Sequence, residues 1–249
     1  MSVVRGKTIL ITGAAKRIGH ALAIELAKQG ANIIIHYNTS EGEAKTLFDD
    51  IRNLGVEVYL TKADLTKPRE SSELIQKAME TAGVIDALIN SASVFSAKKV
   101  WDVTIDDLNI DMLVNAWAPF ILSREFAQKL GRGKIVNFLD TRIAGYDFDR
   151  FSYYLSKKML ETLTMSLALE FAPNITVNAV APGLILPPEG KDRRYLEKLE
   201  KTVPLKRHGA VSDVVSSAIF LLLSDFVTGQ VIYVDGGKHL LQTFEGLSS

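Results

Sequence analysis

Residues 8–19 read TILITGAAKRIG, an apolar run followed by a glycine-containing turn and the start of a helix. The run Thr8–Thr12 is short and rich in isoleucine, as expected of a buried strand. Gly13 permits a tight turn, and the small side chains of Ala14 and Ala15 let a ligand approach the backbone. The helix that follows presents N–H groups to an anion. This order predicts a pyrophosphate-binding turn, and the alternative is a plain strand-to-helix turn that uses its glycines only for geometry.

The same alternation of apolar runs and amphipathic stretches continues along the chain. Seven runs rich in Ile and Val are predicted to be strands, at Thr8–Thr12, Asn32–His36, Val56–Thr61, Ala87–Asn90, Lys134–Leu139, Thr176–Ala179 and Val231–Val234. Helical periodicity separates them, at Arg17–Gln29, Glu41–Asn53, Arg69–Ala82, Ile105–Leu130, Tyr153–Phe171 and Val211–Leu223. Strands that alternate with helices build a parallel sheet from βαβ units. We therefore expect an α/β fold, with a Rossmann-type doubly wound seven-stranded parallel sheet.

Composition and charge limit the classes of function. The 249 residues are 47% hydrophobic, which suits a single domain over residues 1–249. Lys plus Arg equals Asp plus Glu at 29 each, so no charge excess attracts nucleic acid or an anionic membrane. The chain has no cysteine, and its four histidines lack metal-ligand spacing. We expect a small-molecule substrate, with no nucleic-acid partner, no membrane partner and no metal.

Two further features concern location and loops. The N-terminus has no signal-peptide core, and the apolar run Ile219–Leu223 is too short to cross a bilayer, so a cytoplasmic location is expected. Three prolines and two glycines make residues 182–192 irregular. We expect a substrate loop at about residues 182–203.

The end of the second predicted strand indicates which nucleotide is bound. NAD-specific sites usually place an Asp or Glu there, about 20 residues after the turn, to bond the ribose hydroxyls. Residues 36–40 read HYNTS and contain no acid. Lys16 and Arg17 supply cations, and Thr39 and Ser40 supply hydroxyls, so a 2′-phosphate would find charge-assisted partners. This pattern favours NADP(H) over NAD(H), unless Lys16 and Arg17 are simply solvated residues at a helix start.

Two Tyr-x-x-x-Lys pairs overlap in YYLSKK, residues 153–158. Residues four apart share a helix face, so the ammonium of Lys157 can lower the pKa of the Tyr153 phenol and allow proton exchange near neutral pH. Tyr154 and Lys158 have the same spacing. Because such pairs are common on exposed helix faces, the spacing alone leaves open whether either pair is catalytic.

These motifs, in their order, resemble the short-chain dehydrogenase/reductase family over nearly the whole chain. The matching segments are residues 12–19, 64–65, 90–93, 115, the Tyr-x-x-x-Lys pair, 178–183, 228–230 and 235–237. In that family a serine often precedes the catalytic lysine, and a polar or small residue lies 13 positions before the tyrosine. This selects Tyr153 and Lys157, with Asp140 at the matching position. The resemblance implies an NADP(H)-dependent oxidoreductase that forms a homotetramer.

The resemblance also implies a role for each matching residue. Tyr153 would donate the proton, Lys157 would hold the nicotinamide ribose, and Asn115 would kink its helix and hold a water linked to Lys157. The implied catalytic residues are Asn115, Asp140, Tyr153 and Lys157. The implied cofactor-binding residues are Gly13, Lys16, Arg17, Ile18, Gly19, Asn38, Thr39, Ser40, Asp64, Leu65, Asn90, Ala92, Ser93, Tyr153, Lys157, Pro182, Gly183 and Ile185.

Departures from the common family pattern narrow the substrate. Arg17 stands where most members have Gly, Asp140 stands where most have Ser, and residues 92–95 read ASVF. This combination resembles the pteridine reductase branch, in which Phe95 would stack on a pterin ring against the nicotinamide. The implied substrate-binding residues are Arg17, Ser93, Phe95, Asp140 and Tyr153. Reduction of a ring C=N needs a proton at nitrogen as hydride reaches carbon, and a carboxyl beside a phenol can relay it.

Other functions fit parts of this pattern. A 3-oxoacyl carrier-protein reductase, or another carbonyl reductase of the family, would use the same cofactor site, although Asp140 argues against it. A non-catalytic nucleotide-binding protein would not need Asn115, Tyr153 and Lys157. Phe95 itself is open to a second interpretation, as an ordinary core or lid aromatic.

Overall fold

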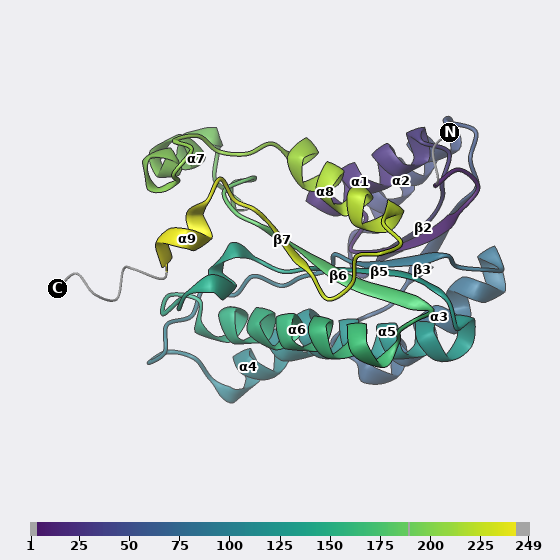
Figure 1. Cartoon of the computed structure of the whole chain (residues 1–249), viewed down its shortest axis with the longest axis horizontal. Coiled ribbons are helices and arrows are strands. Elements are labelled where there is room, and N and C mark those ends of the chain that lie inside the picture. The colour runs from purple at the N-terminus through teal and green to yellow at the C-terminus, as the bar shows by residue number, and fades with distance from the viewer. Residues whose placement is uncertain (1–3, 189, 243–249) are drawn as a thin grey trace.

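The computed structural model describes residues 4–188 and 190–242, and one parallel sheet lies between two layers of helices (Figure 1). The strand order is β3-β2-β1-β4-β5-β6-β7. The strands are β1 Thr8–Thr12, β2 Asn32–Tyr37, β3 Val58–Lys62, β4 Ala87–Asn90, β5 Gly133–Phe138, β6 Ile175–Pro182 and β7 Val231–Val234. Every neighbouring pair is parallel. The predicted doubly wound, seven-stranded Rossmann-type fold is confirmed.

Helices cover both faces of this sheet. On one side lie α1 Arg17–Lys28, α2 Glu41–Arg52 and α8 Val211–Leu223, and on the other lie α3 Pro68–Ala82, α4 Ile105–Met112, α5 Ala118–Leu130 and α6 Phe151–Glu170 (Figure 1). The short helices α7 Arg193–Leu199 and α9 Lys238–Gln242 were not predicted, because neither is long enough to display a clear helical period. Among the residues described, no helix is long and apolar enough to cross a membrane.

The helix predicted from Ile105 to Leu130 is interrupted. A π-helical segment, Leu113–Trp117, separates α4 from α5. Such single-turn insertions change the direction in which side chains point and are frequent at functional sites. Asn115 lies within this segment, which agrees with the change in helix geometry that the family resemblance implied there. The other predicted elements differ from the observed bounds by a few residues at their ends.

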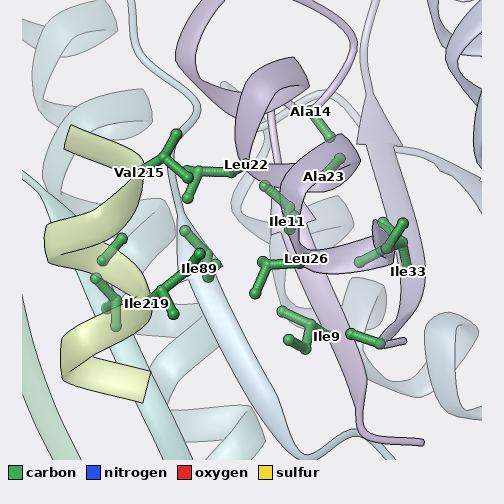
Figure 2. Close-up of a cluster of buried hydrophobic side chains, with 14 of the residues drawn as sticks. Ile9, Ile11, Ala14, Leu22, Ala23, Leu26, Ile33, Ile89, Val215 and Ile219 are labelled. Atoms are coloured by element: carbon green, nitrogen blue, oxygen red, sulfur yellow. The ribbon is translucent and has the colours of Figure 1, made fainter. Parts of the chain in front are cut away.

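Alternate side chains of each strand pack against opposite helical layers. In β1, Ile9 and Ile11 belong to the cluster that contains Leu22 and Leu26 of α1 (Figure 2). Leu10 points the other way, into the cluster beneath α3 and α5. Because both faces of the sheet are covered, its strands are apolar at successive positions. The short apolar runs of the sequence therefore located the strands.

His36, in the last part of β2, is buried and bonds two backbone groups. Its Nδ1 accepts the N–H of Gly13 at 3.1 Å, and its Nε2 lies 3.1 Å from the carbonyl oxygen of Ala63. Because a peptide N–H only donates and a carbonyl only accepts, the ring is neutral, with its hydrogen on Nε2. Burial lowers the pKa of His36 to about 4. His36 thus joins the turn after β1 to the end of β3.

We expect His36 to make the free energy of unfolding fall by about 3 kcal/mol as the solution is acidified. The unfolded chain takes up the proton near the ordinary pKa of 6.5, whereas the folded protein resists it until about 4, so the loss falls between these values. Urea unfolding of the wild type and of His36→Gln, carried out at pH values across this range, measures the loss of unfolding free energy. Gln can accept from Gly13 and donate to Ala63 without titrating, and an unchanged pH dependence in this variant would contradict the role of His36.

Candidate active site

The candidate site lies at the carboxyl ends of β1 and β4, where the strand order reverses. The hydroxyl oxygen of Thr12, the last residue of β1, accepts the N–H groups of Ser91 and Ala92 at 3.0 and 3.1 Å. These bonds join the turn after β1 to the segment after β4. In doubly wound sheets the reversal of strand order opens a crevice for ligands at this edge.

Glycine is sterically required at two positions of the turn after β1. A Cβ on Gly13 would lie 2.8 Å from the Cα of Ala92, and one on Gly19 would lie 2.5 Å from the carbonyl oxygen of Gly13. Within the described chain, no side chain caps the N-terminus of α1, and its first turn holds no acidic residue. Arg17, at the start of α1, has a φ of 55°, which is strained for a residue other than glycine. A close-packed turn that leads into an uncapped, non-acidic helix start fits a pyrophosphate.

The two cations predicted to bind a 2′-phosphate reach protein partners. Arg17 donates from Nη2 to the carbonyl oxygen of Pro187 at 2.9 Å, which ties the turn to the loop after β6. Lys16 pairs with Glu43 of α2, with 2.8 Å between Nζ and Oε1, on the exposed surface. Thr39 and Ser40 lie between β2 and α2, just before Glu43 in the chain. The predicted phosphate partners therefore gather on the same edge of the sheet.

The remaining predicted cofactor residues divide into two groups. Asp64 and Asn38 meet at the ends of β3 and β2, where the Asn38 amide donates to the carboxylate at 3.3 Å. In contrast, Asn90 points inward and donates from its side-chain amide to Asn137 Oδ1 at 2.8 Å, and Ile185 is buried in the core. The side chains of Asn90 and Ile185 therefore pack within the fold, and a contact of these two positions with the cofactor stays a prediction. The other predicted positions, Ile18, Leu65, Ala92, Pro182 and Gly183, lie at the same ends of the strands.

The four predicted catalytic residues come together from three places in the chain, which are α6, the π-helical segment and the segment just after β5. Tyr153 of α6 donates from its hydroxyl to Asp140 Oδ2, just after β5, at 3.0 Å. One turn along α6, Lys157 Nζ donates to the carbonyl oxygen of Phe138 at 2.7 Å. Asn115 donates to Ser156 Oγ at 3.0 Å, next to Lys157 in sequence. No cluster of metal-ligating side chains occurs among the residues described.

The electrostatics of Tyr153 differ from the sequence expectation. Burial, followed by the negative charge of Asp140, raises the pKa of the Tyr153 phenol well above its ordinary value, while Arg142 opposes this. Lys157 was expected to lower that pKa, but its Nζ lies 5.8 Å from the ring centroid and Asp140 is in direct contact. Burial also lowers the pKa of Lys157 to about 8. At neutral pH the phenol keeps its proton and Lys157 carries its charge.

The neighbouring pair, Tyr154 and Lys158, faces away from this cluster. The Tyr154 ring lies 6.2 Å from that of Tyr146. Lys158 donates to the carbonyl oxygen of Ile143 at 3.0 Å and to Glu161 at 2.7 Å. Only Tyr153 is thus directed at Asp140, as the position of Asp140 in the sequence indicated.

Phe95 forms an aromatic wall of the site. Its ring meets the ring of Tyr153 edge to face, with 4.7 Å between the centroids. The guanidinium carbons of Arg150 and Arg142 lie 4.5 and 5.4 Å from the Phe95 centroid. The side chain is 42% exposed, so Phe95 is not an ordinary core residue. Ser93, two residues earlier, donates to Asn115 at 3.0 Å.

Sequence reasoning missed several residues of this site. Arg142 lies 3.3 Å from Asp140 Oδ2 and 2.5 Å from Asp147. Thr141 donates to the buried Asp235 at 2.5 Å, and Asp235 also bonds His239 of α9 at 3.0 Å. The sequence contained one indication that Thr141 and Arg142 belong to the site, because they directly follow Asp140. Asp235 was part of a motif, but its partners are remote in sequence.

Comparisons with known proteins agree with this geometry. A family profile described as enoyl-(acyl carrier protein) reductase matches residues 13–239. The chain is 30% identical to an L-rhamnose 1-dehydrogenase (NAD(P)(+)) of Sphingomonas sp., over 96% of this chain and 99% of that one. Two solved structures of FolM alternative dihydrofolate reductase 1 with NADP are similar. That from Brucella canis has a TM-score of 0.90, 31% identity and 99% coverage of both chains. That from Brucella suis has a TM-score of 0.91 and 32% identity, covering 96% of this chain and 97% of that one.

Gly19→Ala is expected to lower the free energy of unfolding by about 1–3 kcal/mol, the usual cost of overpacking. The reason is the backbone contact of 2.5 Å that its Cβ would make. Gly42→Ala in α2 is the matched control, because its Cβ would meet nothing within 4 Å. There the better helix propensity of alanine should add about 0.5–1 kcal/mol. Urea unfolding of both variants measures the difference, and equal effects would contradict the packing argument.

Proposed function

The chain belongs to the short-chain dehydrogenase/reductase family and is an NADP(H)-dependent oxidoreductase, and we propose that it reduces a pterin or dihydrofolate-type ring. The observation that carries this proposal is the hydrogen bond of 3.0 Å between the Tyr153 hydroxyl and Asp140, beside the partly exposed ring of Phe95. A phenol and a carboxyl in contact suit the delivery of a proton to a ring nitrogen. An aromatic wall suits a flat heterocycle.

The similar solved structures support this choice of substrate. Both are structures of FolM alternative dihydrofolate reductase 1 with NADP, and the similarity covers nearly all of this chain. The sequence departures that resemble the pteridine reductase branch, Arg17, Ser93, Phe95 and Asp140, all lie at the same edge of the sheet. Asp140 and Phe95 both contact Tyr153.

The residues at this edge would hold NADP(H) along the switch point of the sheet. The start of α1, with Gly13, would bind the pyrophosphate, and Arg17 and Ser40 would bind the 2′-phosphate. Lys157 would hold the nicotinamide ribose. NADPH, when bound, supplies the hydride for the reduction.

The protein itself supplies and replaces the proton. Because burial and Asp140 raise the pKa of Tyr153, the phenol stays protonated at neutral pH and can donate to a ring nitrogen that becomes basic as hydride reaches the adjacent carbon. The resulting phenolate beside a carboxylate is unfavourable, so the phenol is quickly reprotonated. The Asp140 side chain is 15% exposed and can pass a proton from solvent to Tyr153. Arg142 compensates the negative charge that the pair carries between these steps.

A second candidate function is the interconversion of a carbonyl and an alcohol. It is favoured by the full-length similarity to an L-rhamnose 1-dehydrogenase. Tyr153 and Lys157 would serve that reaction equally well. The two functions differ in what they require of Asp140, because a carbonyl oxygen takes its proton from the phenol alone.

The assembly proposed for this protein is a homotetramer. Trp117, at the end of the π-helical segment, and Met165 and Leu169 of α6 are exposed, and a second subunit would cover them. Phe220 of α8 and Phe226 are exposed on a different part of the surface. A tetramer with twofold symmetry needs such a second surface, because each subunit contacts more than one neighbour. A cytoplasmic location stays a prediction from the sequence.

Tyr153→Phe is expected to reduce kcat by about 10²-fold or more, because a positioned proton donor is lost. The KM for NADPH should stay nearly unchanged, since most of its contacts lie elsewhere. Tyr154→Phe is the matched control, because this neighbouring tyrosine does not face Asp140. Steady-state NADPH oxidation measures both variants. A damaging Tyr154→Phe with a harmless Tyr153→Phe would show that the wrong tyrosine has been assigned.

The substrate class is tested by a panel of dihydropterin, quinonoid dihydropterin, dihydrofolate and a 3-oxoacyl thioester, each with NADPH, and of L-rhamnose with NADP⁺, because the sugar would be oxidised. We expect turnover of the pterin-type rings with NADPH. Asp140→Ser should lower kcat for these rings by about tenfold or more while the KM for NADPH is retained, because the carboxyl acts in proton delivery. If only the thioester or the sugar is turned over, the pterin assignment is wrong.

A further inference from the structure

Asp111, near the end of α4, is a buried carboxyl outside the proposed proton path. Its exposed fraction is 0%, and burial raises its pKa even though hydrogen bonds from Ser152 and Ser96 oppose this. Burying a carboxyl costs free energy unless hydrogen bonds compensate. The partners of Asp111 therefore indicate why the site retains it.

Two serine hydroxyls donate to the two oxygens of this carboxyl. Ser96 Oγ lies 2.9 Å from Oδ1, and Ser152 Oγ donates to Oδ2. Ser96 directly follows Phe95 in the chain, and Ser152 directly precedes Tyr153. The Asp111 carboxyl thus bonds the serine next to Phe95 and the serine next to Tyr153.

The rings of Phe95 and Tyr153 come from segments with different secondary structure. Tyr153 lies in the first turn of α6, whereas Phe95 lies in a segment, residues 91–99, that has neither helix nor strand. Side-chain bonds are what hold such a segment. The Asn115 side chain accepts the backbone N–H of Val94 and donates to the Val94 carbonyl oxygen, both at 3.0 Å. Asp111 accepts a hydrogen bond from Ser96.

We propose that Asp111 is a positioning residue that fixes the Phe95 ring against Tyr153 by bonding Ser96 and Ser152 at the same time. The proposal rests on the roles proposed above for these two rings. A carboxyl suits this task because its two oxygens accept from opposite directions, and charge-assisted bonds are stronger than neutral ones. The rings then meet at one distance and angle, which aligns a flat substrate on Phe95 with the proton of Tyr153.

Two substitutions at Asp111 separate the hydrogen bonds from the charge. Asp111→Asn can still accept from one hydroxyl and donate to the oxygen of the other, so kcat/KM is expected to stay within about threefold of wild type. Asp111→Leu removes both bonds at similar volume and should lower kcat/KM for the pterin by about tenfold or more. Asp106→Asn, on the exposed side of α4, is the matched control. Retention of wild-type kcat and KM by a folded Asp111→Leu would overturn the proposal.

The two serines test each side of the link separately. Ser96→Ala should raise the KM for the pterin and weaken binding of an oxidised pterin, measured by calorimetry, because Phe95 is released. Ser152→Ala should lower kcat with pterin binding nearly kept, because Tyr153 is displaced. A merely structural role would change stability without this division between KM and kcat. These variants also decide the matter if Asp111→Leu does not fold, because unchanged kcat and KM in both would overturn the proposal.

Tyr153→Phe distinguishes failure of this inference from failure of the proposed function. If Tyr153→Phe loses turnover while the Asp111 and serine variants keep wild-type constants, only the positioning role is wrong. If Tyr153→Phe keeps full turnover, the proposed catalytic role itself is wrong.

Discussion

The site depends on the parallel register of β1 and β4, which pairs Thr12 with Asn90 at the carboxyl edge of the sheet. The connections from these two strands leave in opposite directions, so a crevice remains between them. The Thr12 hydroxyl bonds the backbone just after Asn90 and holds the two sides of the crevice together. One side becomes the close-packed glycine turn, and the other becomes the segment that carries Phe95. Every other functional group is placed relative to this pair of strands.

Burial then sets the chemistry of the groups that meet there. Tyr153, Lys157, Asn115 and Asp111 are all buried, and each has hydrogen-bond partners that hold its side chain in one position. In an interior of low polarity, charged forms are unfavourable, and the pKa of the phenol rises while that of the ammonium falls. The same environment makes each hydrogen bond worth more than it would be in water. The protein's own hydrogen bonds therefore hold these four side chains in place.

The sequence predicted which residues form the candidate site, through motifs whose spacing resembles a known family, but it did not predict their contacts. The family resemblance favoured Tyr153 over Tyr154, through the serine before Lys157 and the position of Asp140, and in the structure the Tyr153 hydroxyl lies 3.0 Å from Asp140. The direction of the Tyr153 pKa could not be predicted, because it depends on burial and on direct contact with Asp140. Likewise, no local pattern shows that Lys16 pairs with Glu43 or that Arg17 reaches Pro187. Arg150 joins the site through its contact with Phe95, and Arg142 joins it through contacts with both Phe95 and Asp140.

The sequence by itself determined the strands, most helices and the position of the phosphate turn, because these follow from local periodicity and from glycines that no larger side chain can replace. It also determined the chemical types present at the carboxyl edge, through motifs whose order matches a known family. Tertiary structure alone decided that Asn90 turns into the core, that α4 and α5 are separated by a π-helical segment, and that Asp111 bonds Ser96 and Ser152. These features are contacts between segments remote in the chain, and they arise only when the folded backbone brings their atoms within hydrogen-bonding distance.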